Sequence, residues 1–175
     1  MKPEAILLVI DMQQRLLPHI DAGETLSRHC HALVRAAGLL GVPVLATEQN
    51  PRGLGASVDG LFVPNQRVIE KHTFDATLND AFVAALPSPD DGVIVVAGAE
   101  AHVCVLLTTL GLLRLDYRVE LVADAVGSRD PANRAIALTR AAQEGARLTT
   151  TETAIFNWLG TCRRPEFREA LGLIK

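Results

Sequence analysis

The sequence predicts a single-domain α/β protein in which helices cover both faces of a six-stranded parallel β-sheet. Six apolar runs of strand length alternate with stretches of helical periodicity along the chain. The 175 residues, of which 49% are hydrophobic, are enough for one domain with a full core. No internal repeat, low-complexity tract or linker interrupts the pattern. We therefore expect residues 1–175 to form one domain.

The six strands are predicted from short apolar runs that end at small or polar residues. Pro43 lies near the start of the second run and does not prevent it from forming a strand. Between the second and third runs, residues 48–65 are rich in Gly, Pro and Asn and are predicted to form a long functional loop. The predicted strands are residues 5–10, 42–46, 67–70, 93–97, 118–123 and 147–149.

The helices are predicted from helical periodicity together with residues that start and stop helices. A capping box is expected at residues 21–24 and another at 149–152, Gly41 is expected to end the first long helix, and Thr77 to cap a later one. Asp130 followed by Pro131 is a further helix start. The predicted helices are residues 25–40, 77–85, 101–115 and 131–145, one that opens at 149–152, and a last one after Pro165.

The composition favours a protein that acts on small molecules inside the cell. The formal net charge is −3 and no Lys/Arg-rich run is present, so neither a nucleic acid nor an anionic membrane surface is an expected partner. No apolar run reaches the ~18 residues that a membrane span needs. Residues 1–4 run directly into the first predicted strand, so no signal peptide is expected. The three widely spaced cysteines, Cys30, Cys104 and Cys162, fit a reducing, cytoplasmic setting.

Three reactive side chains follow predicted strands. Asp11 follows the first strand, Lys71 the third, and Cys104 comes one turn after the fourth, in the segment GAEAHVCV at residues 98–105. In a doubly wound sheet, ligands bind beyond the carboxyl ends of the strands. A thiol with an acid and a base beside it is a nucleophilic site, and a helix N-terminus or a cation lowers the pKa of a thiol. Asp11 would accept the thiol proton, and Lys71 would stabilise the thiolate.

Each of these residues also has a purely structural interpretation. A carboxylate at a strand end often caps the next helix, a lysine in a loop is often only solvated, and a lone cysteine is often a small buried hydrophobic residue. Only their joint placement at strand ends favours catalysis.

With these motifs, the chain resembles the isochorismatase-like cysteine hydrolases, and within them the isochorismatase domain-containing proteins. The resemblance rests on Asp11-Met12-Gln13, on Lys71 and on residues 98–105, and secondarily on residues 47–55 and 122–125. It implies a Rossmann-like three-layer α/β/α fold with an Asp–Lys–Cys triad. It also implies a cis peptide between Ala99 and Glu100, and an oxyanion hole formed by the N–H groups of Glu100 and Cys104.

The chain differs from two branches of that family. Nicotinamidases of this superfamily bind a metal through histidines, whereas the loop at residues 48–55 contains none. Neither a catalytic metal nor another cofactor is therefore expected. True isochorismatases cleave a vinyl ether and lack the nucleophilic cysteine, so Cys104 argues against that reaction.

Five further residues are weaker candidates for the substrate pocket. Gln13, Glu48 and Gln49 follow the first two strands and could contact a ligand, although a capping or holding role suits them equally. Phe74 would be either a wall of the pocket or part of the core. His102 is predicted to face a neighbouring loop or subunit, because Asp11 already fills the role of the base.

The sequence thus predicts a metal-independent hydrolase of a small amide or related acyl compound, acting through a thioester. The alternatives are a non-catalytic or redox-sensing protein of the same fold and a hydrolase of isochorismate-type vinyl ethers. A homo-oligomer is expected from the resemblance. The apolar residues Ile155, Phe156 and Trp158 fit either a subunit interface or the core.

Overall fold

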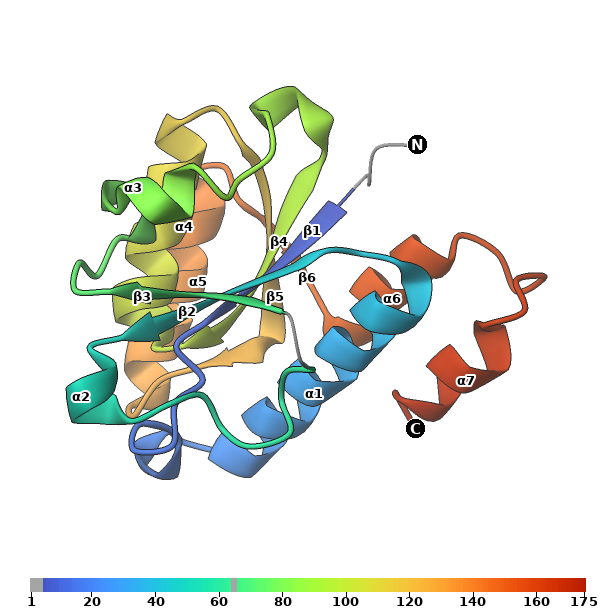
Figure 1. Cartoon of the computed structure of the whole chain (residues 1–175), viewed down its shortest axis with the longest axis horizontal. Coiled ribbons are helices and arrows are strands. Elements are labelled where there is room, and N and C mark those ends of the chain that lie inside the picture. The colour runs from blue at the N-terminus through green and yellow to red at the C-terminus, as the bar shows by residue number, and fades with distance from the viewer. Residues whose placement is uncertain (1–4, 64–65) are drawn as a thin grey trace.

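The strands of the computed structural model, which describes residues 5–63 and 66–175, form one parallel sheet (Figure 1). Their order is β3-β2-β1-β4-β5-β6, which confirms the predicted fold class. Because the order reverses between the first and fourth strands, a crevice opens beyond their carboxyl ends. The strands are β1 (Ala5–Ile10), β2 (Val44–Gln49), β3 (Arg67–Lys71), β4 (Val93–Ala99), β5 (Arg118–Gly127) and β6 (Arg147–Thr149).

Helices cover both faces of this sheet (Figure 1). One face carries α1 (Gly23–Leu40) and α6 (Thr151–Leu159), with α7 (Phe167–Gly172) beyond them. The other face carries α4 (Leu106–Arg114), α5 (Pro131–Gln143) and the short α3 (Asp80–Val83). A further single turn, α2 (Pro51–Leu54), lies within the segment predicted to be entirely loop.

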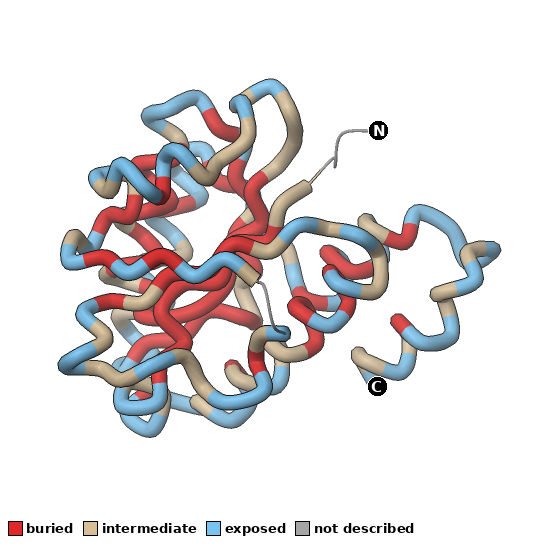
Figure 2. Tube along the Cα trace, viewed as in Figure 1, coloured by how far each residue is buried: buried red, intermediate tan, exposed pale blue. Residues whose placement is uncertain are grey.

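Two hydrophobic cores lie on either side of the sheet, and β1 belongs to both. Leu7 and Val9 pack beneath α1 and α6, whereas Leu8 and Ile10 face α4 and α5. All four side chains are fully buried, as the red central strands of Figure 2 show. A strand buried on both faces reads as a continuous apolar run, which is why the sequence predicted β1 correctly.

Four strands extend beyond their predicted ends, and β3 does so by a single residue, to Lys71. β2 continues to Gln49, β4 to Ala99 and β5 to Gly127. The polar and small residues at these ends still pair in the ladder, because Gln49 lies opposite Lys71 and Ala99 lies opposite Gly127. The apolar pattern alone stops too early, because a polar residue or a glycine follows each predicted end, although Ala99 is itself buried in a hydrophobic core.

Three predicted helix starts are wrong. No capping box forms at residues 21–24, because α1 follows Ala22 in a left-handed conformation with no side-chain cap. The predicted helix at 77–85 is split into a turn at Ala76–Leu78, capped by Asp75, and α3, capped by Asn79. At α6 the capping residue is Thr150, one residue later than predicted.

The helix predicted from residue 101 opens as a wide turn, Ala101–Val105, and continues as α4, whereas the signals at the ends of two other helices are confirmed. Asp130 caps α5 by accepting a hydrogen bond from the Ala132 N–H, and Gly41 ends α1 in the left-handed conformation that glycine tolerates. Of the apolar residues in α6, Ile155 is fully buried in the core. Phe156 is partly exposed and packs against Phe167, with 6.5 Å between ring centroids.

Candidate active site

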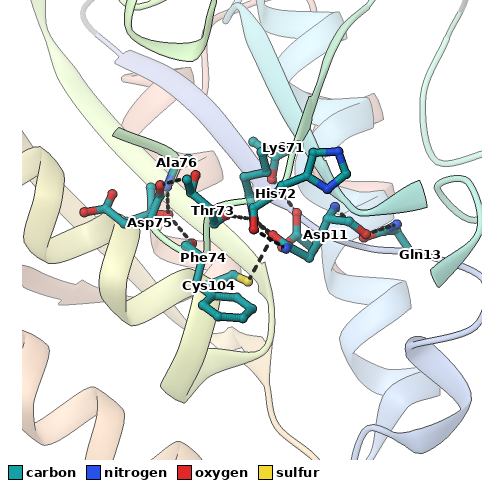
Figure 3. A network of polar contacts seen from close by, with 12 residues as sticks. Asp11, Gln13, Lys71, His72, Thr73, Phe74, Asp75, Ala76 and Cys104 are labelled. Atoms are coloured by element: carbon teal, nitrogen blue, oxygen red, sulfur yellow. Dashed lines mark hydrogen bonds and ion pairs between the residues drawn. The ribbon is translucent and has the colours of Figure 1, made fainter. Parts of the chain in front are cut away.

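The crevice brings Asp11, Lys71 and Cys104 together from three separate elements (Figure 3). Asp11 directly follows β1 with a φ of 49°, a left-handed conformation, and its N–H donates to the Thr47 carbonyl. Lys71 ends β3, and Cys104 lies in the turn that follows β4. The sequence therefore placed all three residues at the correct edge of the sheet.

Asp11 and Lys71 form a buried ion pair. Their Oδ2 and Nζ atoms are 2.8 Å apart, and the two side chains are 1% and 0% exposed. The other oxygen, Oδ1, accepts a 2.7 Å hydrogen bond from the Thr47 hydroxyl. A buried charge needs a partner and further hydrogen bonds, and both are present here. The Asp11 carboxylate is thus fixed in one orientation.

Lys71 has two further oxygen partners. Its ammonium donates to Gln49 Oε1 at 2.7 Å and to the Thr73 carbonyl at 3.3 Å. Because an ammonium carries three donors, Asp11, Gln49 and Thr73 use all of them. The ammonium of Lys71 is consequently held in one position by three oxygen atoms.

Cys104 lies in a wide turn, Ala101–Val105, that joins β4 to α4. The Ala99–Glu100 peptide bond before this turn is cis. The Glu100 carbonyl accepts hydrogen bonds from the N–H groups of Val103 and Val105, the two neighbours of Cys104. The thiol points toward Asp11 and Lys71 (Figure 3), and its sulfur is 3.9 Å from Gln49 Oε1.

Burial raises the pKa of the Cys104 thiol to about 12. The Asp11 carboxylate adds to this rise, whereas the Lys71 ammonium opposes it. The sequence-based expectation of a lowered thiol pKa is therefore wrong. That expectation included the lowering of the pKa by the helix N-terminus and Lys71. It did not include the increase caused by loss of water around the sulfur and by the negative charge of Asp11. At neutral pH the resting form of Cys104 is therefore the protonated thiol.

A pocket of about 520 Å³ opens onto Cys104 and Asp11. Its lining combines apolar walls with charged side chains at several points. A larger groove of about 770 Å³ lies along the start of α1 and includes none of the three reactive residues. The pocket at the crevice is lined by Asp11, Arg15, Leu16, His19, Gln49, Gly53, Leu54, Phe74, Glu100, Val103, Cys104 and Arg129.

Two of the five weaker candidates reach this pocket. Gln49 and Phe74 line it, and Phe74 is half exposed there. Gln13 instead clamps the polypeptide chain, because its side-chain amide donates to the carbonyls of Gln49 and Gly55. Glu48 accepts hydrogen bonds from the backbone and hydroxyl of Ser57.

His102 does not line the pocket. Its Nδ1 is 2.9 Å from the Ser128 hydroxyl, on the segment that follows β5. Its ring thus links the turn of Cys104 to that segment.

Sequence reasoning missed several residues of the site. Thr47 was hidden because the second strand was expected to end at residue 46. Arg129 was missed because the fifth strand was expected to end at residue 123, whereas it continues to Gly127 at the carboxyl edge. Arg15 and His19 belong to the segment between β1 and α1, for which no element was predicted.

Three further features of the described residues lie outside the crevice. Within residues 5–63 and 66–175, no cluster of three or more His, Cys, Asp or Glu side chains is placed to hold a metal ion. In the same ranges, no helix is both long and apolar enough to span a membrane. The Cys30 thiol is buried, and its pKa is raised to about 12 by that burial and by Asp124.

Sequence comparison matches most of the chain to one family. A family model described as the isochorismatase domain matches residues 5–153. Isochorismatase domain-containing protein 2 from Pongo abelii is 37% identical over 172 residues, with 98% of this chain and 83% of the relative covered. Isochorismatase domain-containing protein 1 from Salmo salar is 33% identical over 171 residues, and the chain spans only 60% of that relative's length.

Solved structures share the fold over nearly the whole chain. A protein described as the MAR1 ribonuclease of Caenorhabditis elegans is 32% identical, with a TM-score of 0.90, and the match covers 99% of this chain and 90% of that one. YcaC from Pseudomonas aeruginosa, described with a covalent acrylamide, is 25% identical, with a TM-score of 0.89 and coverage of 98% and 89%. YcaC from Escherichia coli, described as an octameric hydrolase of unknown specificity, is 24% identical, with a TM-score of 0.87 and coverage of 98% and 93%.

Proposed function

The chain belongs to the isochorismatase family, and we propose that it is a metal-independent cysteine hydrolase of a small amide or related acyl compound. Cys104 is the nucleophile, Asp11 the general base and acid, and Lys71 the cation that keeps the carboxylate of Asp11 in place. The observation that carries the proposal is the buried 2.8 Å ion pair between Asp11 and Lys71 beside the thiol.

The raised thiol pKa defines the first step. Because the resting form is a protonated thiol, the proton must leave as the sulfur attacks the carbonyl carbon of the substrate. Asp11 is adjacent and takes this proton. The carbonyl oxygen then carries the developing negative charge, and the N–H groups of Glu100 and Cys104 are proposed to stabilise it.

The second half of the reaction uses the same residues. Asp11 returns the proton to the leaving nitrogen, so that ammonia or an amine departs and a thioester remains on Cys104. Water then attacks the thioester with Asp11 again accepting a proton, and the thiol is restored. Lys71 takes no part in these proton transfers, since its three donors are already occupied. None of these steps requires a metal.

One structural neighbour adds support for a reactive nucleophile. The covalent acrylamide described for the Pseudomonas YcaC is an adduct of a neighbour in the same fold. Acrylamide is both a primary amide and a reagent for thiols, so the adduct is compatible with a pocket that accepts an amide beside a nucleophile.

A panel of small primary amides tests the proposal by release of ammonia and by intact mass of the protein. We expect wild type to accumulate an acyl adduct on Cys104, and Cys104→Ala and Asp11→Asn to lose turnover by at least about a thousandfold, as removal of a nucleophile or its base does in other enzymes. Activity that survives Cys104→Ala would favour vinyl-ether cleavage. Oxidation of Cys104 without any acyl adduct would favour a redox-sensing role.

RNA is the competing substrate, because the Caenorhabditis neighbour is described as a ribonuclease. The net charge of −3 and the confined pocket favour small molecules. Incubation with single-stranded and structured RNA is expected to leave it intact. Cleavage that Cys104→Ala abolishes would overturn the assignment to amides.

We also propose that the protein forms a homo-oligomer. The Escherichia YcaC neighbour is described as octameric, and Leu78 and Ile136 are about two-thirds exposed on this chain. Light scattering during size-exclusion chromatography would measure the mass, and a monomer at micromolar concentration would contradict the proposal.

A further inference from the structure

The charged side chains at the pocket leave an excess of positive charge. Asp11 is neutralised by Lys71 directly behind it, and Glu100 is neutralised by Arg129, whose Nε lies 3.1 Å from the carboxylate. Arg15 is the remaining charged side chain. Its Nη1 donates only to the backbone carbonyls of Arg52 and Gly53, and it meets no carboxylate in the described ranges 5–63 and 66–175. One positive charge is therefore left for a ligand.

Arg129 is a second pocket residue with hydrogen-bond donors that have no partner in the described residues. Glu100, which is 10% exposed, accepts from both the Nε and the backbone N–H of Arg129 and so fixes the position of the guanidinium. The side chain of Arg129 is nevertheless 63% exposed and lines the pocket. Among the described residues, its two terminal nitrogens donate to nothing. A guanidinium held by Nε presents the paired donors that bind a carboxylate.

Arg129, which we treat as an anion site, is linked through Glu100 to the turn that carries Cys104. Glu100, which holds Arg129, also accepts with its carbonyl the hydrogen bonds on either side of Cys104. The guanidinium and the thiol are thus attached to the same short turn. The same pocket is lined by the apolar side chains of Leu54, Phe74 and Val103, which suit a short methylene chain.

We propose that the substrate is a small amide that carries a carboxylate at the end remote from the scissile bond, such as the monoamide of a short dicarboxylic acid. Arg129 binds the carboxylate, and Arg15 supplies the balancing positive charge. This inference rests on the proposed function and names its substrate class. Hydrolysis then converts the monoamide and water into a dicarboxylate and an ammonium ion, with the thiol regenerated.

A pair of alkylating reagents tests the anion site without any need for turnover. Iodoacetate and iodoacetamide have nearly the same shape, and each transfers its two-carbon group to the sulfur with loss of iodide and of the thiol proton. The ratio of their rate constants at Cys104, measured by intact mass, reports the preference for an anion. We expect Arg129→Gln to lower this ratio about tenfold, as loss of a hydrogen bond to a charged group does.

Two comparison variants make the result specific. Arg129→Lys keeps the charge and should retain most of the preference. Arg140→Gln changes an exposed arginine on α5 that does not line the pocket, and should leave the ratio at its wild-type value. If Arg129→Gln and Arg15→Gln both match wild type, the anion site is refuted.

Turnover then separates the two proposals. Succinamate and succinamide differ by a carboxylate in place of a second amide. We expect wild type to hydrolyse succinamate with a KM at least about tenfold lower, and Arg129→Gln to raise that KM more than it lowers kcat. Equal KM values for the two substrates would refute the inference and leave amide hydrolysis standing. A strong preference for iodoacetate without turnover of any amide would support the anion site and refute amide hydrolysis.

Discussion

Gly98 lies so close to Ile10 that a Cβ on it would be 2.0 Å from the Ile10 carbonyl oxygen. Gly98 also has a φ of 121°, which side-chain-bearing residues rarely adopt. The close approach places the end of β4 against the end of β1, which carries Asp11. Only glycine allows the strands that carry the nucleophile and the base to meet in this way.

Gly98→Ala is therefore expected to cost more than about 3 kcal/mol of stability, because backbone strain adds to overpacking of a buried strand. Urea denaturation of the purified protein measures this loss, and absence of soluble protein would be the extreme result. Gly38→Ala is the matched control. Gly38 lies within α1, where an added Cβ meets nothing within 4 Å, so about 0.5–1 kcal/mol of added stability is expected. Similar free energies of unfolding for the two variants would contradict the argument.

The Asp11–Lys71 pair predicts strong coupling in a double-mutant cycle. Lys71→Met leaves the Asp11 carboxylate buried without its cation, which costs about 3–5 kcal/mol. Asp11→Asn combined with Lys71→Met removes both charges and should recover a large part of that loss. Urea denaturation of the two single variants and the double variant measures the coupling. Strictly additive losses would mean that the pair carries no interaction energy.

The raised pKa of Cys104 predicts the pH dependence of its alkylation by iodoacetamide. A free thiol titrates near 8.5, so its rate levels off above about pH 9.5, whereas Cys104 should become steadily more reactive through pH 10 and beyond. Intact mass with peptide mapping separates it from the exposed Cys162. A plateau below pH 8 would show that the resting form is a thiolate.

Asp11→Asn should affect alkylation and hydrolysis in opposite directions. The negative charge of Asp11 raises the thiol pKa, so its removal lowers that pKa and should speed alkylation several-fold at pH 9. Hydrolysis loses its base and should fall sharply. Measuring both rates on the same preparation distinguishes a catalytic base from a structural carboxylate, for which both rates would fall together with stability.

Helix capping offers a test at two aspartates that look alike in the sequence. Asp130 caps α5, so Asp130→Ala should cost about 1 kcal/mol. Asp21 lies two residues before the first residue of α1 and caps nothing, so Asp21→Ala should change stability by less than about 0.5 kcal/mol. Thermal and urea denaturation compare the two. Equal losses would mean that the capping box at 21–24 forms after all.

The sequence was informative where one physical signal dominated. The apolar runs of β1 and β4 predicted strands, and the parallel sheet then implied that Asp11, Lys71 and Cys104 lie at one edge. Helix starts were less predictable, because several side chains compete for one cap. Thr149 and Thr150 are both suitable, but Thr149 pairs with Val122 at the end of β6, and Thr150 forms the cap.

The environment of the site was the least predictable part. Nothing in the sequence shows that Cys104 loses its water, and desolvation is the largest cause of its raised pKa. Arg129 is 25 residues from Cys104 in the chain, and its attachment to Glu100 depends on how far β5 extends. Effects of this kind arise from tertiary contacts, which a local pattern does not contain.

The two contacts of Glu100 matter for any redesign of the substrate specificity of this protein. Its carbonyl holds the turn that presents Cys104, while its carboxylate holds Arg129. Replacing Glu100 would leave its backbone carbonyl, and so the turn of Cys104, in place, but it would release Arg129, and a library built at this position would lose the anion site in most clones. Diversity introduced at Arg129 and at Phe74 instead would alter the choice of ligand while leaving the nucleophile aligned.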